Sequence, residues 1–135
     1  MHDERFLLRR AVVLFERTSS QAPQITEYRF GLIRAMNGLG DSLPAREASE
    51  LYRKAFWAAE PFSVFSPRNV RELLSQAEVH LRWPRWNVAA PAAERQRMGE
   101  VTVRLWEKSA GHAPGNRWVL QSLAEARRTL TAHSP

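Results

Sequence analysis

Residues 66–86 have the sequence SPRNVRELLSQAEVHLRWPRW, and this stretch decides the fold. Ser66 can cap the exposed N–H groups of a helix, and Pro67 fits the first helical position, where no backbone donor is needed. Apolar side chains then recur at steps of three and four, the spacing of one buried helical face, at Val70, Leu73, Leu74, Ala77 and Leu81. A central helix is therefore predicted to end near Trp83, because Pro84 disfavours helical geometry in the residue before it.

The residues that follow this helix, Arg82 to Trp86, combine two indoles with two guanidiniums. One interpretation is a plug, in which the indoles close the end of a bundle and the arginines stack on their faces. A second is a protein-binding hot spot, because Trp and Arg dominate such sites. A third is stacking of single-stranded nucleic acid on the indoles. Because Pro84 separates Trp83 from Trp86, we expect one indole to be buried and the other exposed.

Proline and glycine interrupt the apolar periodicity at five places, and between them the spacing of three and four returns. The predicted interruptions are residues 19–23, 38–43, 60–66, 84–91 and 111–115. No segment alternates apolar and polar residues as a half-buried strand does. The sequence therefore predicts an all-α fold, with residues 1–135 forming a single-domain bundle of about six helices.

Individual residues predict where these helices begin, end and approach each other. Gly38 and Gly40 are predicted to end the second helix, because glycine takes the left-handed C-cap conformation without strain. Gly31, in the same helix, lies where a close approach of a neighbouring helix would use the missing side chain. Ser42 is predicted to cap the third helix and Asn116 the last, since their side-chain oxygens accept hydrogen bonds from exposed N–H groups.

The composition bounds the class of protein. A chain of 135 residues with 44% hydrophobic and 25% charged residues is typical of one soluble globular domain. No apolar run approaches the roughly 18–20 residues that a membrane span needs. The N-terminal residues lack the basic, apolar and small-residue regions of a signal peptide, so we expect a cytoplasmic protein. The absence of cysteine removes disulfides and thiolate sites.

The formal net charge of +6 raises the alternative of a basic all-α nucleic-acid-binding protein. In that alternative, phosphates would be contacted by Arg82, Arg85, Arg95 and Arg97. Only Lys54 and Lys108 are lysines, and this skew is typical of a GC-rich genome rather than of a selected phosphate-binding surface. The arginines are also spread along the chain among glutamates, without a basic tail.

No motif for catalysis or cofactor binding is present. His2, His80, His112 and His133 are widely separated, and no two share a metal-ligand spacing. Neither GxSxG, GxGxxG nor GxxxxGK[ST] occurs. Nearly every glutamate falls on a helix face shared with arginine, as solvated ion pairs do. The sequence predicts a protein that is not an enzyme and has no cofactor or metal.

Residues 9–44 combine a helix, a polar loop with a proline, Tyr28-Arg29, Arg34-Ala35, a pair of glycines and Leu43-Pro44. This order resembles segments of the TssA (ImpA-related) proteins of bacterial type VI secretion systems. The resemblance implies a cytoplasmic, non-enzymatic helical module that self-associates and contacts baseplate, tube or sheath components.

The first functional prediction is therefore a protein–protein interaction or assembly module. Its predicted partner is another protein or a second copy of the chain, and not a membrane. The predicted partner-binding residues are Phe62, Phe65, Arg82, Trp83, Arg85 and Trp86.

Overall fold

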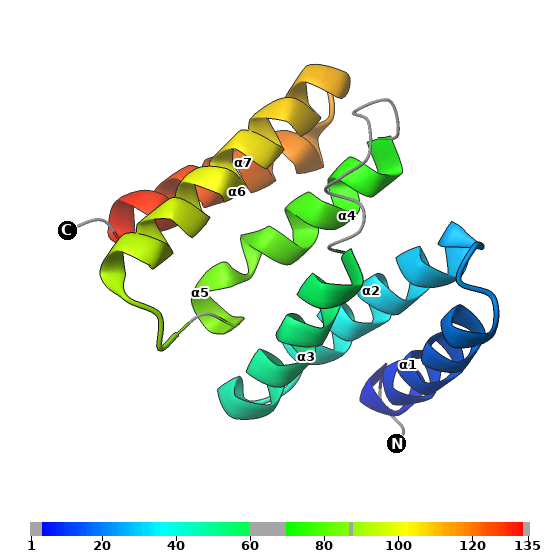
Figure 1. The fold of residues 1–135 in the computed structure, drawn as a ribbon. Helices are drawn as coiled ribbons and strands as arrows, with labels where there is room; N and C mark the ends of the chain where they lie inside the picture. Colours follow the sequence, from blue (N-terminus) through cyan, green and yellow to red (C-terminus); the bar gives the residue numbers. More distant parts are fainter. Residues whose placement is uncertain (1–3, 60–69, 87, 134–135) are drawn as a thin grey trace.

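The computed structural model describes residues 4–59, 70–86 and 88–133, and every regular element in these ranges is a helix (Figure 1). The all-α prediction is confirmed. The helices are α1 (Glu4–Gln21), α2 (Thr26–Asp41), α3 (Ala45–Ala59), α4 (Val70–Leu81), α5 (Trp83–Trp86), α6 (Ala92–His112) and α7 (Arg117–Ala132). The described ranges contain seven helices instead of the predicted number of about six, because the Trp-rich turn forms a short helix of its own. No helix in the described ranges is long and apolar enough to cross a membrane.

Helix α4 lies between two groups of helices (Figure 1). On one side α1, α2 and α3 pack in chain order, and on the other α6 and α7 form a hairpin. Each group has its own hydrophobic cluster, and α4 contributes Val79 to the first and Ala77 to the second. The central helix is thus covered on two sides.

Because of this double covering, the predicted inward stripe of α4 is only partly correct. Leu73 and Ala77 are buried as expected, whereas Leu74 is half-buried. Burial extends to the residues Glu72, Gln76, Val79 and His80, which the single-stripe pattern left outside the core. The predicted start of this helix at Ser66 and Pro67 lies outside the described residues.

The prediction that Gly38 and Gly40 end the second helix is wrong, because α2 continues to Asp41. Gly40 lies where α2 crosses α3 closely: a Cβ there would be 2.6 Å from Cε1 of Tyr52. The role of Gly40 is therefore to let α2 and α3 pack closely, because it has no side chain. Gly31 allows the close helix approach that was predicted, since a Cβ there would lie 2.6 Å from the ring of Phe15 in α1.

The two capping predictions have opposite outcomes. Asn116 caps α7 as predicted, because its side-chain oxygen accepts a hydrogen bond of 3.1 Å from the Val119 N–H. Ser42 does not cap α3; its hydroxyl donates to the Leu39 carbonyl at 2.8 Å and so belongs to the end of α2.

The central helix ends near Trp83 as predicted, at Leu81, but Pro84 does not exclude helical structure there. The chain leaves α-helical geometry at Arg82, and α5 then begins at Trp83 with Pro84 in its second position. Proline is tolerated there because the first N–H groups of a helix have no partner within it.

Candidate functional site

Both indoles of the Arg82–Trp86 turn are buried, so the expectation that one is exposed is wrong. Trp83 is 1% and Trp86 7% exposed. The Trp86 indole N–H donates to the Val79 carbonyl at 3.1 Å, and its ring lies 4.7 Å from that of Phe56. The guanidinium of Arg95 covers Trp83 at 5.5 Å from the ring centroid. The burial of both indoles agrees with the plug interpretation and leaves neither as a surface contact. The turn's own arginines do not stack on the indoles, because Arg82 and Arg85 lie over the ring of Tyr52 instead, at 5.9 and 4.9 Å from its centroid.

The two arginines of the turn are held by groups of α2, α3 and α4. Arg82 donates to both carboxylate oxygens of Asp41, at 2.9 and 2.7 Å, and to Glu78 at 2.9 Å. Arg85 donates to the Tyr52 hydroxyl at 2.7 Å, and Tyr52 in turn donates to Asp41 at 2.6 Å. The cluster therefore ties α2, α3, α4 and α5 together.

These contacts shift the acid–base properties of the cluster. Burial by itself would raise the pKa of Asp41, but the hydrogen bonds from Arg82 and Tyr52, with the charge of the arginines, outweigh it and hold this pKa below its usual value. Burial and the neighbouring Asp41 carboxylate raise the pKa of Tyr52 to about 12. Asp41 therefore stays ionised and Tyr52 neutral across the physiological range.

The six predicted partner-binding residues do not form one surface in the described part of the chain. Phe62 and Phe65 lie outside the described residues. Trp83 and Trp86 are core residues, while Arg82 and Arg85 lie together beside Asp41. Of the remaining arginines named for phosphate binding, Arg95 is half-buried and Arg97 exposed. A role of the two turn arginines in binding stays a prediction.

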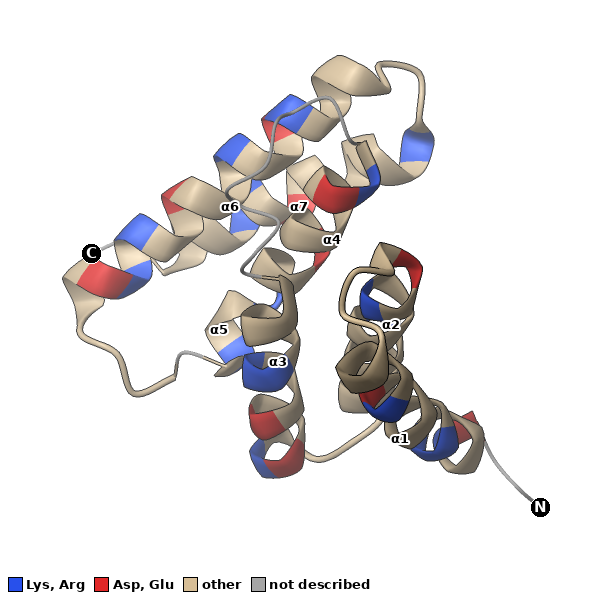
Figure 2. Cartoon of the chain, turned by 45° about the vertical axis from the view of Figure 1, so that its right-hand side comes forward, with Lys and Arg blue, Asp and Glu red and all other residues tan. Residues whose placement is uncertain are grey.

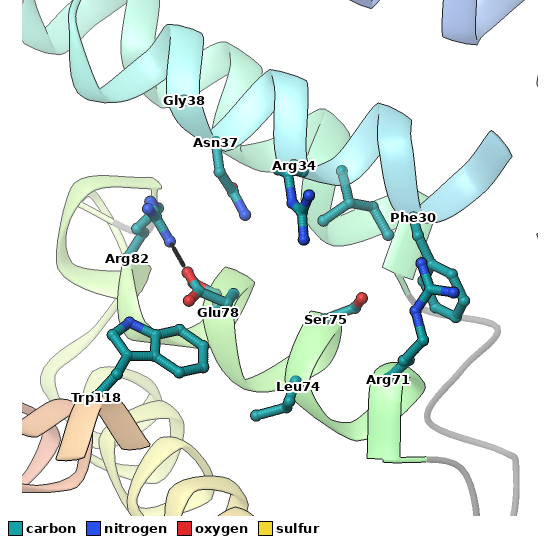
Figure 3. A pocket seen from close by; sticks show the side chains of 11 residues that line it. Phe30, Arg34, Asn37, Gly38, Arg71, Leu74, Ser75, Glu78, Arg82 and Trp118 are labelled. Carbon is teal, nitrogen blue, oxygen red and sulfur yellow. Dashed lines mark hydrogen bonds and ion pairs between the residues drawn. The ribbon is translucent and has the colours of Figure 1, made fainter. Parts of the chain in front are cut away.

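A groove of about 400 Å³ lies between α2 and α4, and sequence reasoning missed it (Figure 3). One wall is the face of α2 that carries Phe30, Ile33, Arg34 and Asn37; the other is the face of α4 that carries Arg71, Leu74, Ser75, Glu78 and Arg82. On both helices these residues recur at steps of three and four, so each helix presents one stripe to the groove. Its volume is within the range of small-ligand sites, roughly 300–1,000 Å³.

The charged groups of the groove are mostly guanidiniums. Arg71 pairs with Glu27 at 2.6 Å and lies 4.5 Å from the ring centroid of Phe30, which marks one end. Arg82 marks the other end, paired with Glu78 and Asp41. Arg34, between them, is exposed and forms no ion pair or hydrogen bond with another described residue. The groove therefore presents an excess of positive charge.

Asn37 is a buried amide in the wall of this groove. It is 5% exposed, and its Oδ1 is inaccessible and has no hydrogen-bond partner among the described residues. Figure 3 shows its side chain pointing from α2 toward α4, with the amide nitrogen at the tip. An unpartnered buried acceptor costs about 1–3 kcal/mol of stability. The sequence does contain a sign of this site: Asn37 is a polar residue seven positions after Phe30, on the same otherwise apolar face of the helix.

Trp118, at the start of α7, is an indole that the sequence did not single out. It is 45% exposed and lies at the Arg82 end of the groove, where Figure 3 shows its ring beside Glu78. Its other contact is with the buried ring of Trp106, edge to face at 5.5 Å. Trp118 thus offers an apolar surface at the mouth of a basic groove.

A second candidate surface is the outer face of α1, which we define as Phe6, Leu7, Val13 and Leu14. These side chains are 53–62% exposed. They are four of the nine large exposed apolar residues in the described chain, concentrated on one helix at the edge of the molecule (Figure 1). A stripe of this kind is typical of an interaction surface.

Basic and acidic residues are interspersed along α1, α3 and α6 (Figure 2). In the part of the chain that the structure describes, no three His, Asp or Glu side chains are grouped so as to hold a metal ion. The chain matches no protein-family model, no curated protein and no solved structure.

Proposed function

We propose that this chain is a non-enzymatic protein assembly module that associates with a second copy through the outer face of α1. The observation that carries the proposal is the concentration of four exposed apolar side chains on that one helix. Burying each of them would contribute about 1.5–3 kcal/mol of hydrophobic free energy at most, before the cost of association.

The sequence of α1 suits an antiparallel pair with its twofold axis near residues 10 and 11. Leu7 and Leu14 are equally far from that midpoint, so Leu7 of one copy would face Leu14 of the other. Arg5 and Glu16 are also equally far from it and lie on the same side of the apolar stripe, beyond its Val13 edge. In an antiparallel pair this flank meets its own counterpart, which would place Arg5 against Glu16 twice. Charge and apolar surface therefore support one register.

The expected affinity is low. Helix α1 has 18 residues and is about 27 Å long. Two such helices bury less than the roughly 800 Å² per partner of a standard interface. A dissociation constant on the order of 10–100 μM is expected, corresponding to about −6 kcal/mol.

Sedimentation velocity over a concentration series tests the proposal by charge reversal. Arg5→Glu and Glu16→Arg should each weaken association at least tenfold, because like charges would then meet twice. The double variant should restore it. Glu125→Arg, an exposed change of the same kind on α7, is the matched control. A wild type that stays monomeric at about 500 μM, or a double variant no better than the single ones, contradicts the proposal.

A further variant tests the position of the twofold axis. Arg10 lies beside that axis, so two guanidiniums would approach each other in the pair, although each also lies 5.8 Å from the ring centroid of Phe6 in its own copy. Arg10→Gln should therefore tighten association and reduce its dependence on salt. Weaker association of this variant would mean that the helices pair in a different register.

The resemblance of residues 9–44 to TssA proteins would place such a module in a type VI secretion assembly. The net charge of +6 supports the alternative, a nucleic-acid-binding protein. The interspersed charges in Figure 2 favour assembly, because a phosphate-binding surface usually gathers its cations on one face. Submicromolar oligonucleotide binding at physiological salt, with a steep salt dependence, would establish the alternative.

A further inference from the structure

We infer that the groove between α2 and α4 binds an extended, acidic segment of a partner protein. Arg34 and Arg71 would receive its carboxylates, and Asn37 would bind its backbone. This groove and the outer face of α1 share no residue, so the inference stands apart from the proposed self-association.

The buried amide indicates a ligand with backbone-like polar groups. The Asn37 Nδ2 faces the groove, where it can donate to a carbonyl of a bound chain. A half-turn of the amide would present Oδ1 instead, which can accept from a backbone N–H. A peptide offers both kinds of group at every residue, whereas a simple ionised carboxylate offers acceptors only. Asn37 therefore fits a peptide better than a simple carboxylate.

The charge of the groove selects an acidic segment. Arg34 has no partner among the described residues, and Arg71 has an exposed ion pair that a ligand can exchange at little cost. Arg82 is the exception, since Asp41 and Glu78 already hold it, and we assign it to the wall. We therefore assign Arg34 and Arg71 to two carboxylates of the segment.

The length of the groove fits an extended chain. Its α4 wall runs from Arg71 to Arg82, about 16 Å at the rise of an α-helix. An extended chain covers that distance with about five residues at 3.3 Å each. At the Arg82 end, the half-exposed ring of Trp118 would cover an apolar side chain of the segment. The specified partner is therefore a segment of about five residues that alternates acidic and apolar side chains.

An NMR titration of the full chain tests this inference with a defined probe. The probe is the acetylated and amidated pentapeptide Glu-Leu-Glu-Leu-Glu, and its counterpart with lysine in place of glutamate is the charge control. We expect the glutamate peptide to shift the resonances of Arg34, Asn37 and the Trp118 indole N–H, with a dissociation constant of about 1 mM or below. The lysine peptide should leave them unchanged.

Two variants separate binding from folding. Arg34→Ala changes an exposed side chain and should weaken the peptide at least fivefold, whereas Arg46→Ala on α3, also exposed, should not. Asn37→Leu removes the unpartnered amide and improves helix propensity, so its melting temperature should equal or exceed that of the wild type. The same variant should lose peptide binding at least fivefold. A melting temperature that rises while binding falls is an outcome that a merely structural role of Asn37 would not give.

Three outcomes would overturn the inference. The first is the absence of shifts at 5 mM glutamate peptide, and the second is shifts at residues outside the groove. The third is equal shifts from inorganic phosphate, sodium acetate or a five-nucleotide single strand, each at the peptide concentration. That result would assign the groove to small anions or to nucleic acid. The Arg5→Glu and Glu16→Arg variants should bind the peptide as the wild type does, so each proposal can fail without the other.

Discussion

Arg82 donates two parallel hydrogen bonds to Asp41, from Nε to Oδ1 at 2.9 Å and from Nη2 to Oδ2 at 2.7 Å. Asp41 is the last residue of α2, and Arg82 lies at the junction of α4 and α5. The Arg82 side chain is only 18% exposed, so its charge depends on protein partners. This pair joins the first group of helices to the central one and gives an arginine of the Trp-rich turn a structural role.

Asp41→Asn should destabilise the protein by about 1.5–3 kcal/mol, the range for losing hydrogen bonds to a charged group. Glu78 would still hold Arg82, which keeps the loss below that of a fully orphaned charge. The control is Glu27→Gln, which removes the exposed Arg71–Glu27 pair and should cost under about 1 kcal/mol. Urea denaturation measures both, and equal losses would contradict the structural role of Asp41.

Stability should fall as the pH is lowered from 7 to 5, because of His80. Burial lowers the pKa of this imidazole below its usual 6.5, although its Nδ1 hydrogen bond to the Gln76 carbonyl partly opposes the shift. Below about pH 6.5 the unfolded chain binds a proton that the folded chain does not, so unfolding becomes favoured. In thermal melts, the melting temperature of His80→Gln should depend less steeply on pH than that of the wild type. A pH slope that His80→Gln leaves unchanged would contradict this role of His80.

Asp41 should add a second loss of stability at lower pH. Its folded pKa is held below the usual value of 3.8. Its ion pair therefore contributes fully above the unfolded pKa, and this contribution is lost as the pH falls through the folded one. Thermal melts between pH 5 and 2 should show a smaller loss for Asp41→Asn than for the wild type. An unchanged slope would mean that the Asp41 carboxylate gains nothing from folding.

Gly40→Ala and Gly111→Ala should change stability in opposite directions. A Cβ on Gly40 would lie 2.6 Å from the Tyr52 ring, and overpacking of this kind costs about 1–3 kcal/mol. Gly111 lies in α6 with nothing within 4 Å of the added methyl group. Alanine should therefore stabilise the helix there by roughly 0.4–1 kcal/mol. Differential scanning calorimetry checks both signs, and a neutral Gly40→Ala would show that α2 and α3 can move apart freely.

Trp86→Ala should destabilise by about 3–5 kcal/mol, because the ring is buried and its N–H is hydrogen-bonded. Trp57→Ala is the matched control. Its ring is 65% exposed, and its loss should shift stability by under about 0.5 kcal/mol. Similar melting temperatures for the two variants would contradict the plug formed by the Trp-rich turn.

The sequence by itself determined those features that depend on residues close together in the chain. The spacing of three and four predicted the helices, because it records which face of each helix meets a core. The cap at Asn116 was predictable because its partner, the Val119 N–H, is three residues away. The close approach at Gly31 was also recognisable, since a helix-weakening glycine inside an apolar stripe suggests a packing constraint.

Only the tertiary structure decided features that depend on residues far apart in sequence. Whether Gly40 ends a helix or accommodates a neighbour depends on Tyr52 in the next helix. The burial of both Trp83 and Trp86 requires helices on two sides of α4, which one periodic stripe cannot encode. The groove, with Arg34 and Asn37 facing α4, exists because two stripes 41 residues apart lie side by side. Local sequence sets which side chains share a helix face, and only packing sets which faces meet.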